Sequence, residues 1–183
     1  FAAFFLIVVT IYWRLSHRGQ NLLLLGASYV FYGWIHPWFV LIMLASTTVD
    51  YWAGQRMEDD PANKRRYLSA SLVVNLGMLG AFKYFNFFVE NVRDVLAAMG
   101  LTVAPPLLEL ALPAGISFYT FQALSYTVDV YKGEMHARRH PIDFALFVAF
   151  FPHLVAGPIM RAKNLLVQVE RPRVWDATLA RHG

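Results

Sequence analysis

Long apolar runs alternate with short charged segments along the whole chain. A helix needs about 20 apolar residues to cross a hydrocarbon core of about 30 Å. We expect a membrane helix, truncated in the case of the first run, from each of the runs Phe1–Trp13, Asn21–Ile35, Pro37–Ala53, Tyr67–Val89 and Leu112–Tyr131. The pattern therefore predicts an all-α, polytopic integral membrane protein with about five transmembrane helices.

Two apolar runs depart from a simple crossing. Phe1–Trp13 is too short to span, and we interpret it as a truncated first transmembrane helix. The alternative is the apolar core of a signal peptide, but no small-residue cleavage site follows it. Ile142–Ile159 is interrupted by Pro152, Gly157 and Pro158, so we expect a broken or re-entrant segment. Such backbone is tolerated at membrane depth only where it is buried in protein or lines a cavity.

The run Leu112–Tyr131 is unusual because one of its helical faces is polar. At about 100° per residue, that face carries Phe118, Gln122, Ser125, Tyr126 and Asp129. The residues Phe121, Leu124 and Val128 lie on other faces. Polar groups at membrane depth are costly unless they face other helices or a water-filled cavity, so we expect this helix to line an interior.

The loops differ in charge, and this difference predicts a topology. Basic residues gather in Arg14–Gln20, Arg56–Arg66 and Lys132–His140, which we expect on the cytoplasmic side. The Gly33–Trp38 turn and the segment Glu90–Pro106, expected to form an amphipathic surface helix and a turn, would then lie outside. The basic segment Arg161–Arg173 is expected on the same side as Lys132–His140, because the run between them is broken.

Composition supports a membrane protein. Hydrophobic residues make up 57% of the chain and charged residues 15%, against about 25% charged in soluble domains. The net charge is +4, and no continuous basic stripe indicates nucleic-acid binding. The chain has no cysteine, which excludes disulfides, thiolate metal sites and a cysteine nucleophile.

Several polar residues are candidates for chemistry. His136 and His140 stand four apart, but Pro141 and the absence of an intervening glutamate argue against a metal site. Asp50 and Asp129 lie within apolar runs, where we expect hydrogen bonds between helices. Asp129 can alternatively pair with Lys132. Lys83 has either a functional role or a side chain that extends to the membrane surface.

His153 beside the helix break could act as a base, but we favour a structural or tunnel-lining role. The candidate tunnel-lining residues are Ser117, Phe118, Gln122, Ser125, Tyr126, Asp129 and His153. No metal ligand is assigned.

Several sequence motifs resemble one known family. They are LPAGISFYTFQALSYTVDVYKGE from Leu112, FALFVAFFPHLVAGPIMRA at Phe144–Ala162, NLLLLGASYVFYGW at Asn21–Trp34, and the aromatic run Phe82–Phe88. The chain resembles the first half of a membrane-bound O-acyltransferase (MBOAT), and the alginate O-acetyltransferase-like subfamily is the nearest match. The resemblance covers almost the whole chain, and implies that residues 1–183 are the N-terminal part of a single MBOAT transmembrane domain.

The resemblance also implies an activity. The family transfers an acyl group, here expected to be acetyl, to hydroxyls of an extracytoplasmic polysaccharide such as alginate. Its catalytic histidine lies downstream in a Trp-His-Gly-type motif, and no such tripeptide occurs here. No catalytic residue is therefore assigned, and this chain alone is expected to be inactive.

The resemblance further implies a multi-pass protein of the bacterial inner (cytoplasmic) membrane. Acetyl-CoA or another acetyl carrier would act as a substrate, with no bound cofactor. The expected partners are the lipid bilayer, the acyl donor and periplasmic or membrane-associated polysaccharide-modification subunits, with no nucleic acid. A non-enzymatic transporter or channel segment with the same polar helix face is the alternative function.

Overall fold

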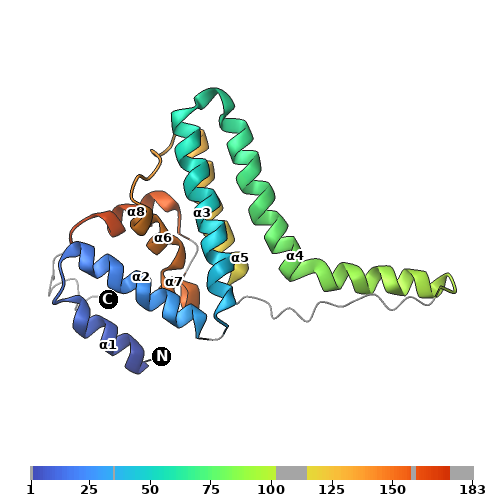
Figure 1. Cartoon of the computed structure of the whole chain (residues 1–183), viewed down its shortest axis with the longest axis horizontal. Coiled ribbons are helices and arrows are strands. Elements are labelled where there is room, and N and C mark those ends of the chain that lie inside the picture. The colour runs from blue at the N-terminus through green and yellow to red at the C-terminus, as the bar shows by residue number, and fades with distance from the viewer. Residues whose placement is uncertain (1, 35, 102–114, 158–159, 174–183) are drawn as a thin grey trace.

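The protein is described by a computed structural model for residues 2–34, 36–101, 115–157 and 160–173, and these residues form helices without any strand (Figure 1). The helices are α1 (Ala2–Tyr12), α2 (His17–Gly33), α3 (Trp38–Asp59), the 3-10 helix η1 (Pro61–Asn63), α4 (Lys64–Ala98), α5 (Ile116–Lys132), α6 (Pro141–Ala149), α7 (Phe151–Ala156) and α8 (Ala162–Glu170). The predicted all-α class is confirmed for these residues.

Helix α5 is the centre of the bundle. It packs against α3 and the first half of α4 on one side, and against α6 and α8 on the other. The largest side chains of the core are aromatic, and they include Tyr119 and Tyr126 of α5 with Phe144 and Phe147 of α6. The expected helix at residues 112–131 is thus present as α5, and Leu112–Ala114 lie outside the described residues.

Glycines fix both ends of α5. Gly115 and Gly133 have φ values of 74° and 75°, in the left-handed region where a side chain would be strained. At the C-terminal end, the Gly133 N–H donates to the Val130 carbonyl and the Glu134 N–H to the Asp129 carbonyl. These are the two bonds of a Schellman motif, so the helix stops where the charged loop begins.

The turn between α3 and α4 is held by side chains. Asn63 and Tyr67 donate hydrogen bonds to the Asp60 carboxylate at 2.9 and 3.0 Å. These bonds, that of Asn63 first, hold the pKa of Asp60 below its ordinary value. Pro61 opens η1, where its missing N–H costs no hydrogen bond.

The described residues 142–157 are interrupted, as the sequence predicts for this run, while Pro158 and Ile159 lie outside the described residues. Helix α6 ends at Ala149, and α7 begins at Phe151 after Phe150 takes a non-helical ψ of 101°. Pro152 lies in the first turn of α7, where a proline is tolerated. The Phe151 N–H donates to the Ser28 hydroxyl at 3.1 Å, which joins the break to α2.

Three segments that the sequence places on one side of the membrane meet in the structure. Arg139 binds Asp59 at 2.8 Å, so the loop after α5 contacts the end of α3. The same loop contacts α8 through the pairs Arg138–Glu170 at 3.1 Å and Lys163–Glu134 at 3.5 Å. These contacts agree with a common side for residues 56–66, 132–140 and 161–173.

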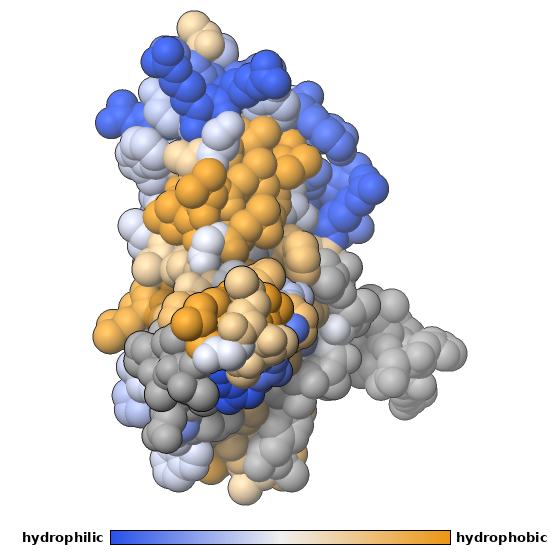
Figure 2. Space-filling view, turned by 90° about the vertical axis from the view of Figure 1, so that its right-hand side faces the viewer, coloured by the Kyte–Doolittle hydropathy of each residue, from blue (hydrophilic) through white to orange (hydrophobic). Residues whose placement is uncertain are grey.

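One helical segment in the described part of the chain, Pro61–Phe85, is long and apolar enough to cross a membrane by length and composition. Charged side chains gather near the α3–α4 turn, and apolar side chains cover the surface below it (Figure 2). The apolar stretches Ala3–Tyr12, within α1, and Pro141–Leu154, across α6 and α7, are shorter. The number of five crossings therefore stays a prediction.

Helix α4 differs from the expected arrangement at one end. The sequence predicts a span that ends at Val89 and a separate surface helix from Glu90, whereas α4 runs without a break from Lys64 to Ala98. Its second half bends and extends away from the bundle (Figure 1). Phe87 and Phe88 are 59% and 62% exposed there, because no other described helix packs against this part.

Candidate functional site

The polar face of α5 points into the bundle. Gln122, Tyr126 and Asp129 are buried, and Ser117, Phe118 and Ser125 are partly buried. Phe121, on another face, is 47% exposed, whereas Leu124 is buried, because several helices surround α5. The inward orientation of this face is therefore present, and its tunnel-lining role stays a prediction.

Gln122 lies in the middle of α5 and faces α6. Its side-chain amide donates to the backbone carbonyl of Phe147, and the side chain is fully buried. Its carbonyl oxygen Oε1 has no hydrogen-bond partner within the described segments. Ser125 instead bonds within its own helix, donating to the backbone carbonyl of Gln122 at 2.7 Å. Gln122 thus binds α6 through its amide nitrogen and leaves its oxygen Oε1 as an acceptor for a further hydrogen bond.

Tyr126 connects α5 to the loop that follows it. Its ring lies 4.5 Å from that of Phe144, and its hydroxyl accepts the Arg138 N–H at 3.0 Å. Gly54 of α3 permits this position, because a Cβ atom there would lie 2.5 Å from the tyrosine hydroxyl oxygen. The close approach of α3 and α5 therefore depends on a residue without a side chain.

Asp129 is buried near the charged end of α5, with 7% exposure. One carboxylate oxygen, Oδ2, has no hydrogen-bond partner in the described part of the chain. Lys132 is exposed and does not pair with it among the described ion pairs, which include Lys163–Glu134 nearby. The alternative pairing with Lys132 is therefore not the arrangement in this structure.

The remaining candidates lie toward the other end of α5. Ser117 accepts a hydrogen bond from the Lys83 ammonium group at 3.5 Å, and that group also lies 5.3 Å from the Tyr84 ring. Lys83 is exposed, in keeping with a side chain that extends to the surface. His153 of α7 packs on Phe150 at 5.3 Å, and its Nδ1 is buried without a partner among the described residues.

The structure does not gather these candidates into one cluster. Ser117 and Asp129 are twelve residues apart on α5, which corresponds to about 18 Å along the helix. Residues spread over this length can line a path but cannot form a single catalytic centre. His153 lies on a separate helix, and Leu154 beside it approaches Gly115 at the start of α5.

A second buried polar group, the Asp50 network, surrounds the Asp50 carboxylate, and sequence reasoning missed its partners. The Asp50 carboxylate is fully buried and accepts hydrogen bonds from Ser71, Asn75 and Thr127, and Ser46 donates to Asn75. The expected interhelical role of Asp50 is confirmed, since its partners lie on α4 and α5. The spacing of four between Ser46 and Asp50, and between Ser71 and Asn75, places each pair on one helix face and could have indicated the network.

His136 is engaged away from any metal site. Its Nδ1 lies 2.8 Å from the Glu58 carboxylate, at the end of α3. Among the described residues, no group of three His, Cys, Asp or Glu side chains could hold a metal ion.

The sequence of this chain is similar to those of proteins named as polysaccharide O-acetylases. The chain is 44% identical over 161 residues to a protein named probable alginate O-acetylase from Pseudomonas aeruginosa, covering 86% of this chain and 31% of that protein. It is 43% identical over 162 residues to the Azotobacter vinelandii protein of the same name, covering 86% and 32%. A peptidoglycan O-acetyltransferase from Helicobacter pylori is 31% identical over 174 residues, covering 81% and 32%.

The chain thus spans about a third of the length of the curated relatives it matches. No family model and no solved structure matches it. These similarities define the class, that of proteins related to polysaccharide O-acetyltransferases. Within that class, the chain belongs to the alginate O-acetylase-like group of the membrane-bound O-acyltransferase family, as its motifs indicate.

Proposed function

We propose that the protein containing this chain is a membrane O-acyltransferase. It transfers an acyl group, acetyl in our proposal, to hydroxyls of an extracytoplasmic polysaccharide such as alginate. The observation that supports this proposal is the similarity to proteins named for the O-acetylation of two polysaccharides, alginate and peptidoglycan. Both are polymers whose sugar hydroxyls can accept an acetyl group.

The proposed reaction is general-base acyl transfer. A sugar hydroxyl attacks the carbonyl carbon of the acetyl donor, a base takes the hydroxyl proton, and the carrier leaves as the acetyl ester forms. The donor is acetyl-CoA or another acetyl carrier. The base expected from the family is a histidine of a Trp-His-Gly motif that this sequence lacks, so the residues of this chain contribute walls and positioning.

Within this proposal, the polar face of α5 contributes to the path of the acyl donor or acceptor. Gln122 and Asp129 support it, because each is buried and keeps one oxygen without a partner in the described residues. A buried acceptor is costly to leave unpaired, so such groups are candidates for contact with a substrate. Tyr126 and Ser125 bond within the protein and would shape this face.

The direct experiment is a deletion of the gene followed by complementation in the host bacterium. We expect the exported polysaccharide to lose its O-acetyl groups, measured per sugar by NMR, and to regain them with the wild-type gene. An unchanged acetyl content with less exported polymer would instead support the transporter alternative.

We also propose a multi-pass inner-membrane protein that works with periplasmic or membrane-associated subunits. The apolar segment Pro61–Phe85 and the charged end formed by residues 56–66, 132–140 and 161–173 support this topology. Single cysteines are placed at Glu134 and Arg171 in a protein without other cysteines, and this chain itself has none to remove. Both are expected to resist an impermeant maleimide in intact cells, and labelling of only one would contradict the common side.

The chain alone is expected to lack acetyl transfer. Loss of a general base typically costs about 10²–10⁴-fold in rate, and the missing walls would remove positioning as well. The measurement is acetyl transfer to polysaccharide by purified residues 1–183. Activity above the background of the detergent blank would contradict the proposal that the catalytic base lies outside residues 1–183.

A further inference from the structure

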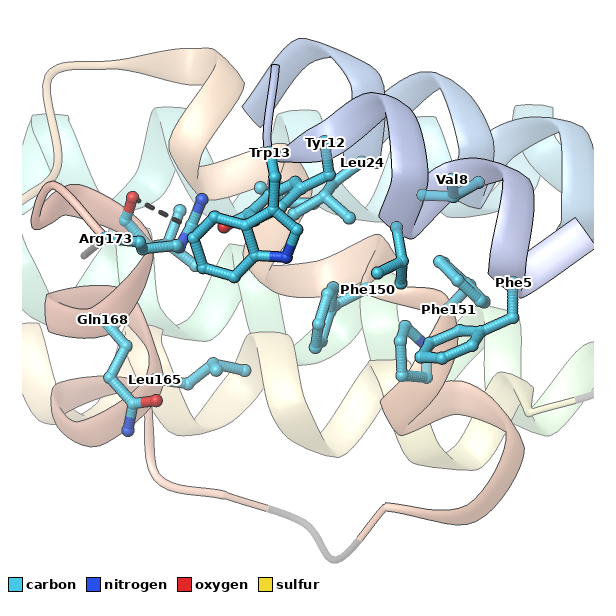
Figure 3. Close-up of a pocket in the computed structure, with 14 residues that line it drawn as sticks. Phe5, Val8, Tyr12, Trp13, Leu24, Phe150, Phe151, Leu165, Gln168 and Arg173 are labelled. Atoms are coloured by element: carbon cyan, nitrogen blue, oxygen red, sulfur yellow. Dashed lines mark hydrogen bonds between the residues drawn. The ribbon is translucent and has the colours of Figure 1, made fainter. Parts of the chain in front are cut away.

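A second feature lies outside the polar face of α5, in a cavity between α1, α2, α6, α7 and α8 (Figure 3). Its volume is about 380 Å³, within the range of about 300–1,000 Å³ that small-molecule sites occupy. Apolar side chains form most of the wall, among them Phe5, Val8, Leu24, Phe151 and Leu165. None of the candidate α5 residues lines it.

The cavity has one cationic end. The Arg173 guanidinium group lies 5.7 Å from the Tyr12 ring centroid and donates to the Asn21 side-chain oxygen at 2.8 Å and to the Val169 carbonyl at 3.4 Å. Asn21 in turn donates to Asp143 at 2.7 Å, so this carboxylate orients the amide. In the described residues Arg173 forms no ion pair, and its charge meets neutral groups.

The position of Arg173 matches the chemistry of a membrane surface. Helix α1 is apolar and ends in Tyr12, followed by Trp13 and Arg14, and aromatic and basic residues concentrate at bilayer interfaces. In Figure 3, Trp13 lies near Arg173, whereas Phe5 and Phe151 lie at the opposite end of the cavity. The cavity therefore combines a cationic interfacial end with an apolar interior.

We propose that this cavity binds an anionic phospholipid, with the phosphate group against Arg173 and one acyl chain along Phe5, Val8 and Phe151. Basic pockets between transmembrane helices recognise anionic lipid headgroups in this way. A polysaccharide does not suit the cavity, because its hydroxyls need polar partners and the wall offers few beyond Arg173 and Gln168. This site is separate from the proposed catalytic function and does not depend on it.

The experiment uses the intact protein, purified from membranes in mild detergent and observed by native mass spectrometry. Phosphatidylglycerol is the anionic probe and phosphatidylcholine the zwitterionic one. We expect Arg173→Gln to reduce retained phosphatidylglycerol about tenfold, because a charge-assisted contact to phosphate is lost. Phosphatidylcholine should change little. Arg171→Gln is the matched control, since Arg171 is an exposed arginine two residues away.

Two further variants test the apolar part. Val9→Trp and Gln168→Trp each place an indole in the lining, and Gln168 is exposed, so its replacement should leave folding intact. Both are expected to lower the retention of both lipids. Equal phosphatidylglycerol retention by Arg173→Gln and Arg171→Gln would overturn the headgroup assignment. Full retention by both tryptophan variants, or displacement of lipid by acetyl-CoA, would overturn the site.

Discussion

Asp50 and Asp129 are two buried carboxylates of one helical bundle with different surroundings. Both oxygens of Asp50 accept hydrogen bonds, and the donors come from α4 and α5. Asp129 keeps the oxygen Oδ2 without a partner in the described part of the chain. A buried acceptor normally has a hydrogen-bond partner. The hydrogen bonds of Asp50 are therefore complete within the described residues, whereas those of Asp129 are not.

Gln122 extends this comparison. Its amide nitrogen donates to the Phe147 carbonyl, so one half of the side chain acts between helices as the Asp50 network does. Its Oε1 remains without a partner among the described residues, as in Asp129. Because Asp50, Gln122 and Asp129 are all buried but differ in their hydrogen bonds, burial of a polar residue does not by itself distinguish structural from functional groups. We propose the completeness of its hydrogen bonds as the criterion, and the variants below test it.

The largest expected loss of stability follows from Asp50→Leu. The change removes the acceptor for Ser71, Asn75 and Thr127 together and leaves these groups buried without it. We expect the free energy of unfolding to fall by about 3 kcal/mol or more, since each unmet buried donor costs about 1–3 kcal/mol. The measurement is thermal unfolding of the purified protein in detergent, followed by intrinsic fluorescence.

Activity separates the two interpretations of Asp50. In the fraction of Asp50→Leu that folds, specific acetyl transfer should stay near the wild-type value. An Asp50→Leu protein of normal stability but without activity would give Asp50 the functional role proposed for Asp129, and would contradict the distinction between the two carboxylates. Thr48→Val is the control, because its hydroxyl is exposed and bonds only to the Leu44 carbonyl of its own helix.

A smaller loss of stability is expected from Gly54→Ala. The new methyl group would lie 2.5 Å from the Tyr126 hydroxyl oxygen, so the ring or α3 must move. Overpacking of this kind typically costs about 1–3 kcal/mol. Gly26→Ala is the matched control, because a Cβ atom there meets nothing within 4 Å and alanine favours a helix. Unfolding temperatures that fall equally in both variants would contradict the contact.

The sequence could predict what depends on periodicity and on local geometry. The polar face of α5 follows from its helical spacing, and the break near Pro152 follows from the fixed backbone of proline. The continuation of α4 beyond Val89 was missed, because the lower apolar content of residues 90–98 indicates the end of a span, whereas these residues include no glycine or proline that would end the helix.

Which polar residues of different helices meet could not be predicted. Ser71, Asn75 and Thr127 are 21, 25 and 77 residues from Asp50, and tertiary packing alone brings them together. The contact between Gly54 and Tyr126 likewise depends on how closely α3 and α5 approach. For the same reason, no pattern in the sequence shows that the hydrogen bonds of Asp50 are complete and those of Asp129 are not.

Gln122→Leu and Asp129→Leu are expected to have the smallest effects on stability. They are also expected to lower the acetyl transfer rate the most. An interhelical hydrogen bond in a membrane contributes about 0.6–2 kcal/mol, so most of each variant should fold. Phe121→Leu and Val128→Leu are the controls from other faces of α5 and should change the activity little.

The most direct test of the account is the acetyl transfer rate per folded molecule for Gln122→Leu and Asp129→Leu in the intact enzyme. Folded yield is judged by size-exclusion chromatography in detergent. The account predicts a rate well below that of the wild type and of both controls, at similar folded yield. A rate per folded molecule equal to the wild type in both variants would contradict it and leave α5 with a structural role alone.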